Sequence, residues 1–283
     1  MVCSVTFHSE RKIPLNKRLI TLVMAVLLAL SLPLQASAAS SASLSKTAQA
    51  SIEKLAAQSS GSLQTQLTGQ TNKLRELETQ DENLDQSIDS LHRANGEKQS
   101  AINARIKQLN AEKLAALKSG STEARERYKP IFTLQTSLNK QLTVARKLKN
   151  KSLVEALEAQ LSVVKASALI ARGDIRLKDE AYAKVKEATA KTVNSVRNVL
   201  KEVSLEQAKI RSEKTASAET GRQIAADSKT LTASLKNKDA AETLRSLSAL
   251  VTSSTQIINQ KIRIQQSEQK ISTLLDKAAS LLP

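Results

Sequence analysis

The sequence is poor in the residues that most compact folds use for turns, cores and cross-links. Its 283 residues include 6 glycines, 4 prolines, 1 cysteine and no tryptophan, and aromatic residues make up 1%. Sandwiches and barrels need many turn formers and strand-forming residues, and disulfide scaffolds need several cysteines. The composition excludes these classes. The abundant residues, chiefly Ala, Leu, Lys, Gln and Glu, favour long helices instead.

The first 38 residues have the pattern of a cleavable secretory signal peptide. Four basic residues precede residue 19, residues 19–32 are almost entirely apolar, and small residues follow at 36–38. The apolar run has about 14 residues, whereas a membrane span needs about 20, so an uncleaved anchor is disfavoured. We expect residues 1–38 to be removed and the product to be secreted, or extracytoplasmic in the cell envelope.

Apolar residues recur at intervals of three, four and seven through most of the remaining chain. One such series is Leu63, Leu67, Leu74, Leu77, Leu84, Ile88 and Leu91. This heptad spacing is typical of coiled coils. Asp81 interrupts the series at one seam position. We predict a short N-terminal segment at 39–61, partly helical or disordered, and a helical coiled-coil region at 62–283 with helices at about 62–118, 122–149, 153–235 and 239–281.

Three sites along this region interrupt the helical pattern. Asn95-Gly96 lies in an eleven-residue step between apolar positions, and it fits either a continuous helix or a tight turn. Ser119-Gly120-Ser121 predicts the end of one helix and the cap of the next. Pro130 predicts a kink, or else the true start of the second helix.

A short basic segment occurs twice, 87 residues apart. Leu148-Lys149-Asn150-Lys151-Ser152 returns as Leu235-Lys236-Asn237-Lys238-Asp239, and each copy has a glutamate three residues after its last residue. A serine or aspartate three residues before a glutamate forms a capping box at a helix start. Each copy therefore predicts a helix end, a basic turn and a new helix. The duplication serves either packing alone or a shared binding task.

These elements define an all-α architecture. Residues 62–149 match residues 153–236 in length and can lie antiparallel to them, with residues 239–281 folded back over part of the pair. We expect an elongated antiparallel coiled-coil or helical-bundle rod, preceded by the signal peptide, with a compact up-down bundle as the competing arrangement. Self-association into a homo-oligomer would bury any apolar stripe that remains.

The residues beyond the predicted leader offer little for catalysis. They include no cysteine and a single histidine, His92, and no Gly-Xaa-Ser-Xaa-Gly turn is present. One histidine without thiols also makes a poor metal ligand set, and the acidic residues are spread around the helix surface. We predict a protein that is not an enzyme, with no catalytic residues, metal or cofactor.

Positive charge is the main functional lead. Residues 39–283 hold 39 basic and 26 acidic residues. The candidate polyanion-binding residues are Arg125, Arg127, Lys129, Arg146, Lys147, Lys149, Lys151, Lys236 and Lys238. Basic residues at helix ends also complement the helix dipole, which is the structural interpretation. The functional interpretation is contact with an anionic envelope polymer or membrane surface; nucleic acid is disfavoured because aromatic residues are not interleaved for base stacking.

In architecture alone, the chain resembles the coiled-coil halves of exported cell-wall hydrolases. The catalytic domain that follows in those enzymes is not recognisable here, so the resemblance implies a scaffold or regulator. We therefore predict an exported helical rod that binds anionic wall or surface polymers. In charge and helix content the chain also resembles small basic extracytoplasmic chaperones, which implies the alternative of a holding chaperone or adaptor that clasps other proteins.

Overall fold

The computed structural model describes residues 38–283, and helices make up 91% of this part of the chain. No strand occurs within it, which confirms the all-α class. The helices are α2 (Lys46–Gln58), α3 (Ser62–Gln108), α4 (Ala111–Lys147), α5 (Lys151–Lys236) and α6 (Ala240–Ser280). The predicted signal peptide, except for its last residue, lies outside the described residues.

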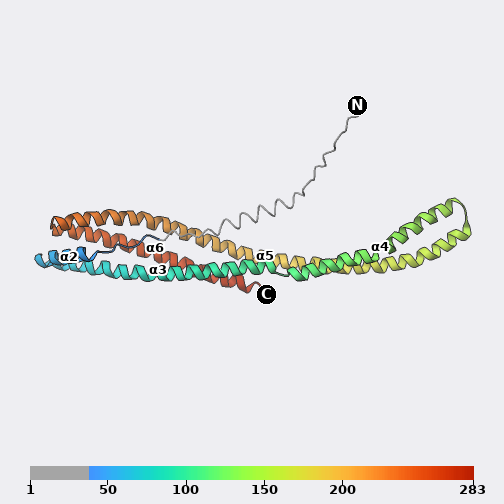
Figure 1. Cartoon of the computed structure of the whole chain (residues 1–283), viewed down its shortest axis with the longest axis horizontal. Helices are drawn as coiled ribbons and strands as arrows, with labels where there is room; N and C mark the ends of the chain where they lie inside the picture. Colours follow the sequence, from blue (N-terminus) through green and yellow to red (C-terminus); the bar gives the residue numbers. More distant parts are fainter. Residues whose placement is uncertain (1–37) are drawn as a thin grey trace, which may run out of the picture.

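The helices form a long rod rather than a compact bundle (Figure 1). Helix α5 has 86 residues, which at 1.5 Å per residue is about 130 Å, and it runs along nearly the whole molecule. Helices α3 and α6 pack together with the C-terminal half of α5, and α2 covers the end of this group. We call this the three-helix section. The arm consists of α4, the turn at residues 148–150 and the N-terminal half of α5, which pack as an antiparallel pair.

The seam of α6 combines apolar and polar residues in the core of the three-helix section. Leu247, Leu250, Ile257, Ile264, Ile271 and Leu275 are buried at heptad spacing. Ser254, Lys261 and Glu268 occupy seam positions between them, seven residues apart, and are also buried. Polar residues at seam positions fix the register of packed helices, because a shifted register would leave them without partners.

Two of these polar seam residues find charged or amide partners on α3. Lys261 is fully buried, and its Nζ lies 2.7 Å from Asp81 Oδ1 and 2.8 Å from Asp85 Oδ2. Asp81, which interrupts the heptad series of α3, thus has its partner on α6. Glu268 Oε1 lies 2.8 Å from His92 Nδ1, and its Oε2 accepts a hydrogen bond from Asn95 Nδ2 at 2.8 Å. These contacts join α3 and α6 at two successive layers.

Helix α3 runs unbroken through Asn95-Gly96, so the continuous-helix interpretation is confirmed there. Buried Asn95 fills the gap in the apolar series by bonding to Glu268. The predicted break at Ser119-Gly120-Ser121 is absent, because α4 continues through these residues.

The break between α3 and α4 lies earlier, at Leu109-Asn110. Asn110 adopts the left-handed conformation (φ 56°, ψ 16°), which asparagine tolerates better than most residues. Its Nδ2 donates a hydrogen bond to Thr189 Oγ1 of α5 at 2.8 Å. Gly120 remains helical because a lone glycine in a helix costs only about 1 kcal/mol relative to alanine. Pro130 also lies inside α4, so it does not mark a helix start.

The two basic turns share one backbone geometry. Their equivalent residues lie 89 residues apart, two more than the 87 residues that separate the matching sequences. Lys149 and Lys238 both adopt φ near +50° as the residue after the helix end. The N–H of the next residue bonds to the carbonyl five residues earlier in each turn, as in a Schellman motif. Asp239 caps α6 as predicted, by accepting from Glu242 N at 3.0 Å. The cap of α5 is Asn150 rather than the predicted Ser152.

The segment before α2 is extended and lies against the three-helix section. Ser41 N donates to Asp81 Oδ2 at 3.0 Å, and Ala42 N donates to Ser254 Oγ at 2.9 Å. A Cβ added at Gly221 of α5 would lie 2.7 Å from the Cβ of Ala39, so this glycine permits the close approach of the segment. Within the segment predicted at 39–61, residues 46–58 form α2.

Candidate functional site

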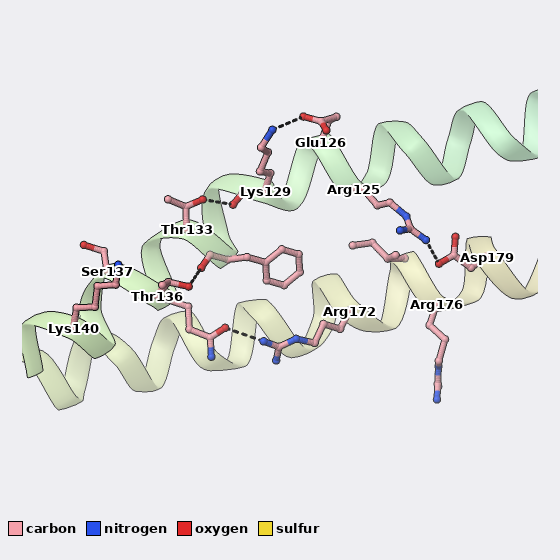
Figure 2. Close-up of a pocket in the computed structure, with 13 residues that line it drawn as sticks. Arg125, Glu126, Lys129, Thr133, Thr136, Ser137, Lys140, Arg172, Arg176 and Asp179 are labelled. Carbon is pink, nitrogen blue, oxygen red and sulfur yellow. Dashed lines mark hydrogen bonds and ion pairs between the residues drawn. The ribbon is translucent and has the colours of Figure 1, made fainter. Parts of the chain in front are cut away.

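An open groove of about 1030 Å³ lies between α4 and α5 in the middle of the arm (Figure 2). Among the side chains that line it are five cations and two carboxylates, namely Arg125, Lys129, Lys140, Arg172, Arg176, Glu126 and Asp179. Phe132, Ile175 and several threonine, serine and glutamine side chains complete the lining. The groove is therefore basic and largely polar, with one aromatic ring.

The groove exists because the packing between α4 and α5 is interrupted here. Ala124 and Leu138 are buried residues of α4 on either side, and no residue between them is buried. Pro130 lies within this stretch and lacks the N–H that would complete the helical hydrogen bond to residue 126. On α5, the buried positions at this level are only alanines, Ala168 and Ala171. Small side chains opposite an underpacked stretch leave space between the helices.

At one end of the groove, an ion pair joins α4 to α5. Arg125 Nη2 lies 2.5 Å from Asp179 Oδ2, and Ser121 Oγ donates to Asp179 Oδ1 at 2.5 Å. The hydrogen bond from Ser121 and the nearby charge of Arg125 lower the pKa of Asp179 below its ordinary value. Asp179 is therefore ionised at neutral pH and compensates Arg125.

A second cation of the groove, Arg172, is held in place without a carboxylate. Its Nη2 donates to Gln135 Oε1 at 3.0 Å, and its guanidinium lies 5.4 Å from the centroid of the Phe132 ring. Both contacts orient the guanidinium while leaving its charge uncompensated. Figure 2 shows Arg172 between the two helices.

The other cations of the groove differ in their pairing. Lys129 pairs with Glu126 at 3.3 Å on the same helix. Lys140 is exposed and has no carboxylate partner within the described residues. Arg176 pairs with Glu180 at 3.5 Å and points away from α4 in Figure 2. Because the two carboxylates are already paired, the groove retains a net positive charge that suits a phosphate or carboxylate ligand.

The nine predicted polyanion-binding residues do not form one site. Arg125 and Lys129 line the groove, and Arg127 lies between them on α4. A second group, Arg146, Lys147, Lys149 and Lys151, surrounds the turn at the tip of the arm, where Arg146 pairs with Glu158 at 2.7 Å. Lys236 and Lys238 lie at the other end of α5, about 130 Å away.

Sequence analysis missed Lys140, Arg172 and Arg176. The signal that identifies Arg172 is the register of the arm hairpin. The contacting pairs Arg125 and Asp179, and Phe132 and Arg172, are each symmetric about residue 152. This centre lies three residues beyond the middle of the turn at 148–150, so the position of the turn alone does not place Arg172 opposite Phe132.

The described residues show neither a metal-ligating cluster nor a helix long and apolar enough to cross a membrane. His92 of α3 contacts the buried Glu268 of α6 in the three-helix section, whereas the groove lies in the arm. Comparison with protein-family models, curated proteins and solved structures gives no match for this chain. The geometry and charge of the rod are therefore the basis for inferring its function.

Proposed function

We propose that this protein is an exported, non-enzymatic helical rod of the cell envelope that binds an anionic wall or surface polymer through the groove of its arm, as a scaffold or regulator. The main support for this proposal is the environment of the Arg172 guanidinium. This guanidinium is fixed by Gln135 and Phe132, and no carboxylate of residues 38–283 pairs with it. An arginine prepared in this way loses little entropy when it binds a phosphate or carboxylate.

The shape of the groove supports a polymer rather than a small molecule as the ligand. The groove is open to solvent and does not enclose a small ligand. The basic tip of the arm begins about six residues beyond Lys140, so a chain lying in the groove can continue towards it. Repeated anionic groups would then meet successive cations, each contributing a contact that salt weakens.

A binding experiment with a matched control tests this function. The purified protein is sedimented with an insoluble wall preparation that retains its phosphodiester polymer, and with the same wall after the polymer has been extracted. We expect binding only to the first wall and a loss of binding as salt rises. The variant Lys140→Gln/Arg172→Gln should weaken binding about tenfold, equivalent to about 1.4 kcal/mol.

The control variant Lys236→Gln/Lys238→Gln removes the same charge at the opposite end of the rod. It should bind within about twofold of the unmodified protein, because its lysines are distant from the groove. If both variants weaken binding equally, the effect depends on net charge alone and the groove is not the binding site. Equal binding to both walls would contradict an anionic polymer as the ligand.

A specific observation also favours the alternative of a holding chaperone or adaptor. Within the described residues, all but two of the large apolar side chains that are exposed belong to the arm. Exposed apolar surface is typical of proteins that hold other proteins. This function predicts that the protein suppresses aggregation of an unfolded client at high salt, whereas the polymer binder does not.

A further inference from the structure

The solvent-facing side of α5 in the arm carries a second heptad seam. Its members alternate in steps of three and four, and they are Ala156, Ala159, Val163, Ala166, Ile170, Gly173 and Leu177. No charged residue occupies any of these positions. Over about 33 Å of helix, this is the pattern of a surface that packs against another helix.

This seam is separate from the one that holds the arm together. The seam facing α4 uses the buried residues Leu157, Leu161 and Ala168. In contrast, Val163, Ile170 and Leu177 are 68%, 71% and 62% exposed. The groove opens between α4 and α5, whereas the residues of the second seam lie on another face of α5 and do not line the groove. Arg176, on the flank of the seam, also lines the groove.

The sizes of the seam residues make the surface complementary to itself. The large residues Val163, Ile170 and Leu177 recur every seven residues, and small residues, Ala159, Ala166 and Gly173, occupy the intervening positions. In an antiparallel pair of identical helices, Val163 faces Ala166 of the second copy and Ile170 faces its Ala159. The four central layers then combine a large with a small side chain, while Gly173 faces Ala156 and Leu177 faces Ser152 towards the ends of the seam. A parallel pair would place small residues opposite small residues and leave voids, which are costly.

The charges beside the seam favour the same arrangement. Glu155 and Arg176 lie on the same flank of the seam, three heptads apart. In the antiparallel register, Glu155 of each copy faces Arg176 of the other, so the pair forms twice. In the monomer, Arg176 has only the exposed Glu180 at 3.5 Å, and Figure 2 shows it directed away from α4. In a parallel register, neither residue meets an opposite charge.

We infer that two copies of this chain associate through the second seam of α5 as an antiparallel, two-fold symmetric dimer. A two-fold contact of this kind closes on itself and produces dimers rather than filaments. The two arms overlap in the middle, and the three-helix sections extend in opposite directions. The dimer has two polyanion grooves, and its formation does not depend on the proposed function.

Sedimentation velocity of the purified protein tests whether the seam forms a dimer. At about 100 µM, a dimer with a dissociation constant of that order or tighter is detected as doubled mass. Ile170→Glu should return the protein to a monomer, because it buries a charge against Ala159 of the second copy. Leu205→Glu is the matched control, since Leu205 is equally exposed but lies outside the arm, and it should remain dimeric. A monomeric unmodified protein, or a dimer that Ile170→Glu leaves intact, overturns the proposal.

Engineered cysteines test the antiparallel register. In a Cys3→Ser background, Ala159→Cys/Ile170→Cys places a cysteine of each copy opposite a cysteine of the other. Within one helix these positions are about 16 Å apart, beyond the roughly 7 Å that a disulfide spans. The double variant should therefore oxidise to a covalent dimer, and neither single variant should. Efficient cross-linking of the single variants would show a parallel pair and contradict the inference.

Charge reversal provides an independent measure of the same register. Glu155→Arg and Arg176→Glu should each weaken the dimer, because like charges then face each other across the interface. The double variant restores opposite charges and should recover most of the dimer affinity. Failure of the double variant to recover affinity, while both single variants remain helical, would contradict the pairing of these residues.

Discussion

The three-helix section and the arm both pack through heptad seams, but they differ in how fully they bury their apolar residues. In the section, three helices enclose a core that includes the fully buried Lys261 and the buried Glu268, each with partners on α3. In the arm, two helices pack over a short core at Leu138, Leu142 and Leu161 and then separate at the groove. Two helices cannot enclose their apolar residues fully. The section therefore has buried polar contacts that fix a single register, whereas the arm leaves a groove and large apolar side chains exposed to solvent.

The largest effect should come from removing the buried charge of the section. Lys261→Ala leaves Asp81 buried without its partner, so we expect the free energy of unfolding to fall by about 3–5 kcal/mol. Lys98→Ala is the control, because Lys98 also joins α3 to α6 but pairs with Asp276 at the exposed surface. It should cost about 1 kcal/mol or less in the same denaturant titration. Similar losses for both variants would contradict the role assigned to burial.

Two glycines on long helices should respond in opposite directions to the same change. Gly221→Ala places a Cβ 2.7 Å from that of Ala39, so it should displace the extended segment and lower stability by about 1 kcal/mol. Gly120→Ala in the arm meets no atom within 4 Å and should raise stability by about 0.5–1 kcal/mol through helix propensity. Thermal unfolding followed by circular dichroism measures both changes. Stabilisation by both variants would show that the segment does not pack against Gly221.

The smallest expected effect is on the loss of folding stability at low pH. A hydrogen bond from Lys270 to the buried Glu206 lowers the pKa of that carboxyl below its ordinary value in the folded protein. The unfolded state then binds the proton more tightly, so this contribution to stability is present above about pH 4.3 and is lost as the pH falls through the folded pKa. Glu206→Gln should reduce the loss of stability on acidification. An unchanged pH profile between about pH 5 and 2 would contradict this contribution.

Local patterns predicted much of this fold. The heptad series located the helices, and the repeated basic segment located both hairpin turns. The break at Asn110 was missed because a left-handed asparagine leaves a weaker sequence signal than a glycine. The partner of Asp81 was also unpredicted, because Lys261 comes from a helix distant in sequence. The sequence revealed basic clusters whose members are contiguous. It did not reveal Arg172, because the position of this residue in the groove depends on how α4 and α5 align across the arm.

Hydrogen exchange with and without an anionic polymer tests whether the arm is the binding end of the rod. A soluble polyphosphate chain serves as the probe. We expect added protection in α4 around Arg125 to Lys140 and in α5 around Arg172, with the amides of the three-helix section unchanged. Protection spread over both ends of the rod, or confined to the three-helix section, would show that the arm is not the binding end.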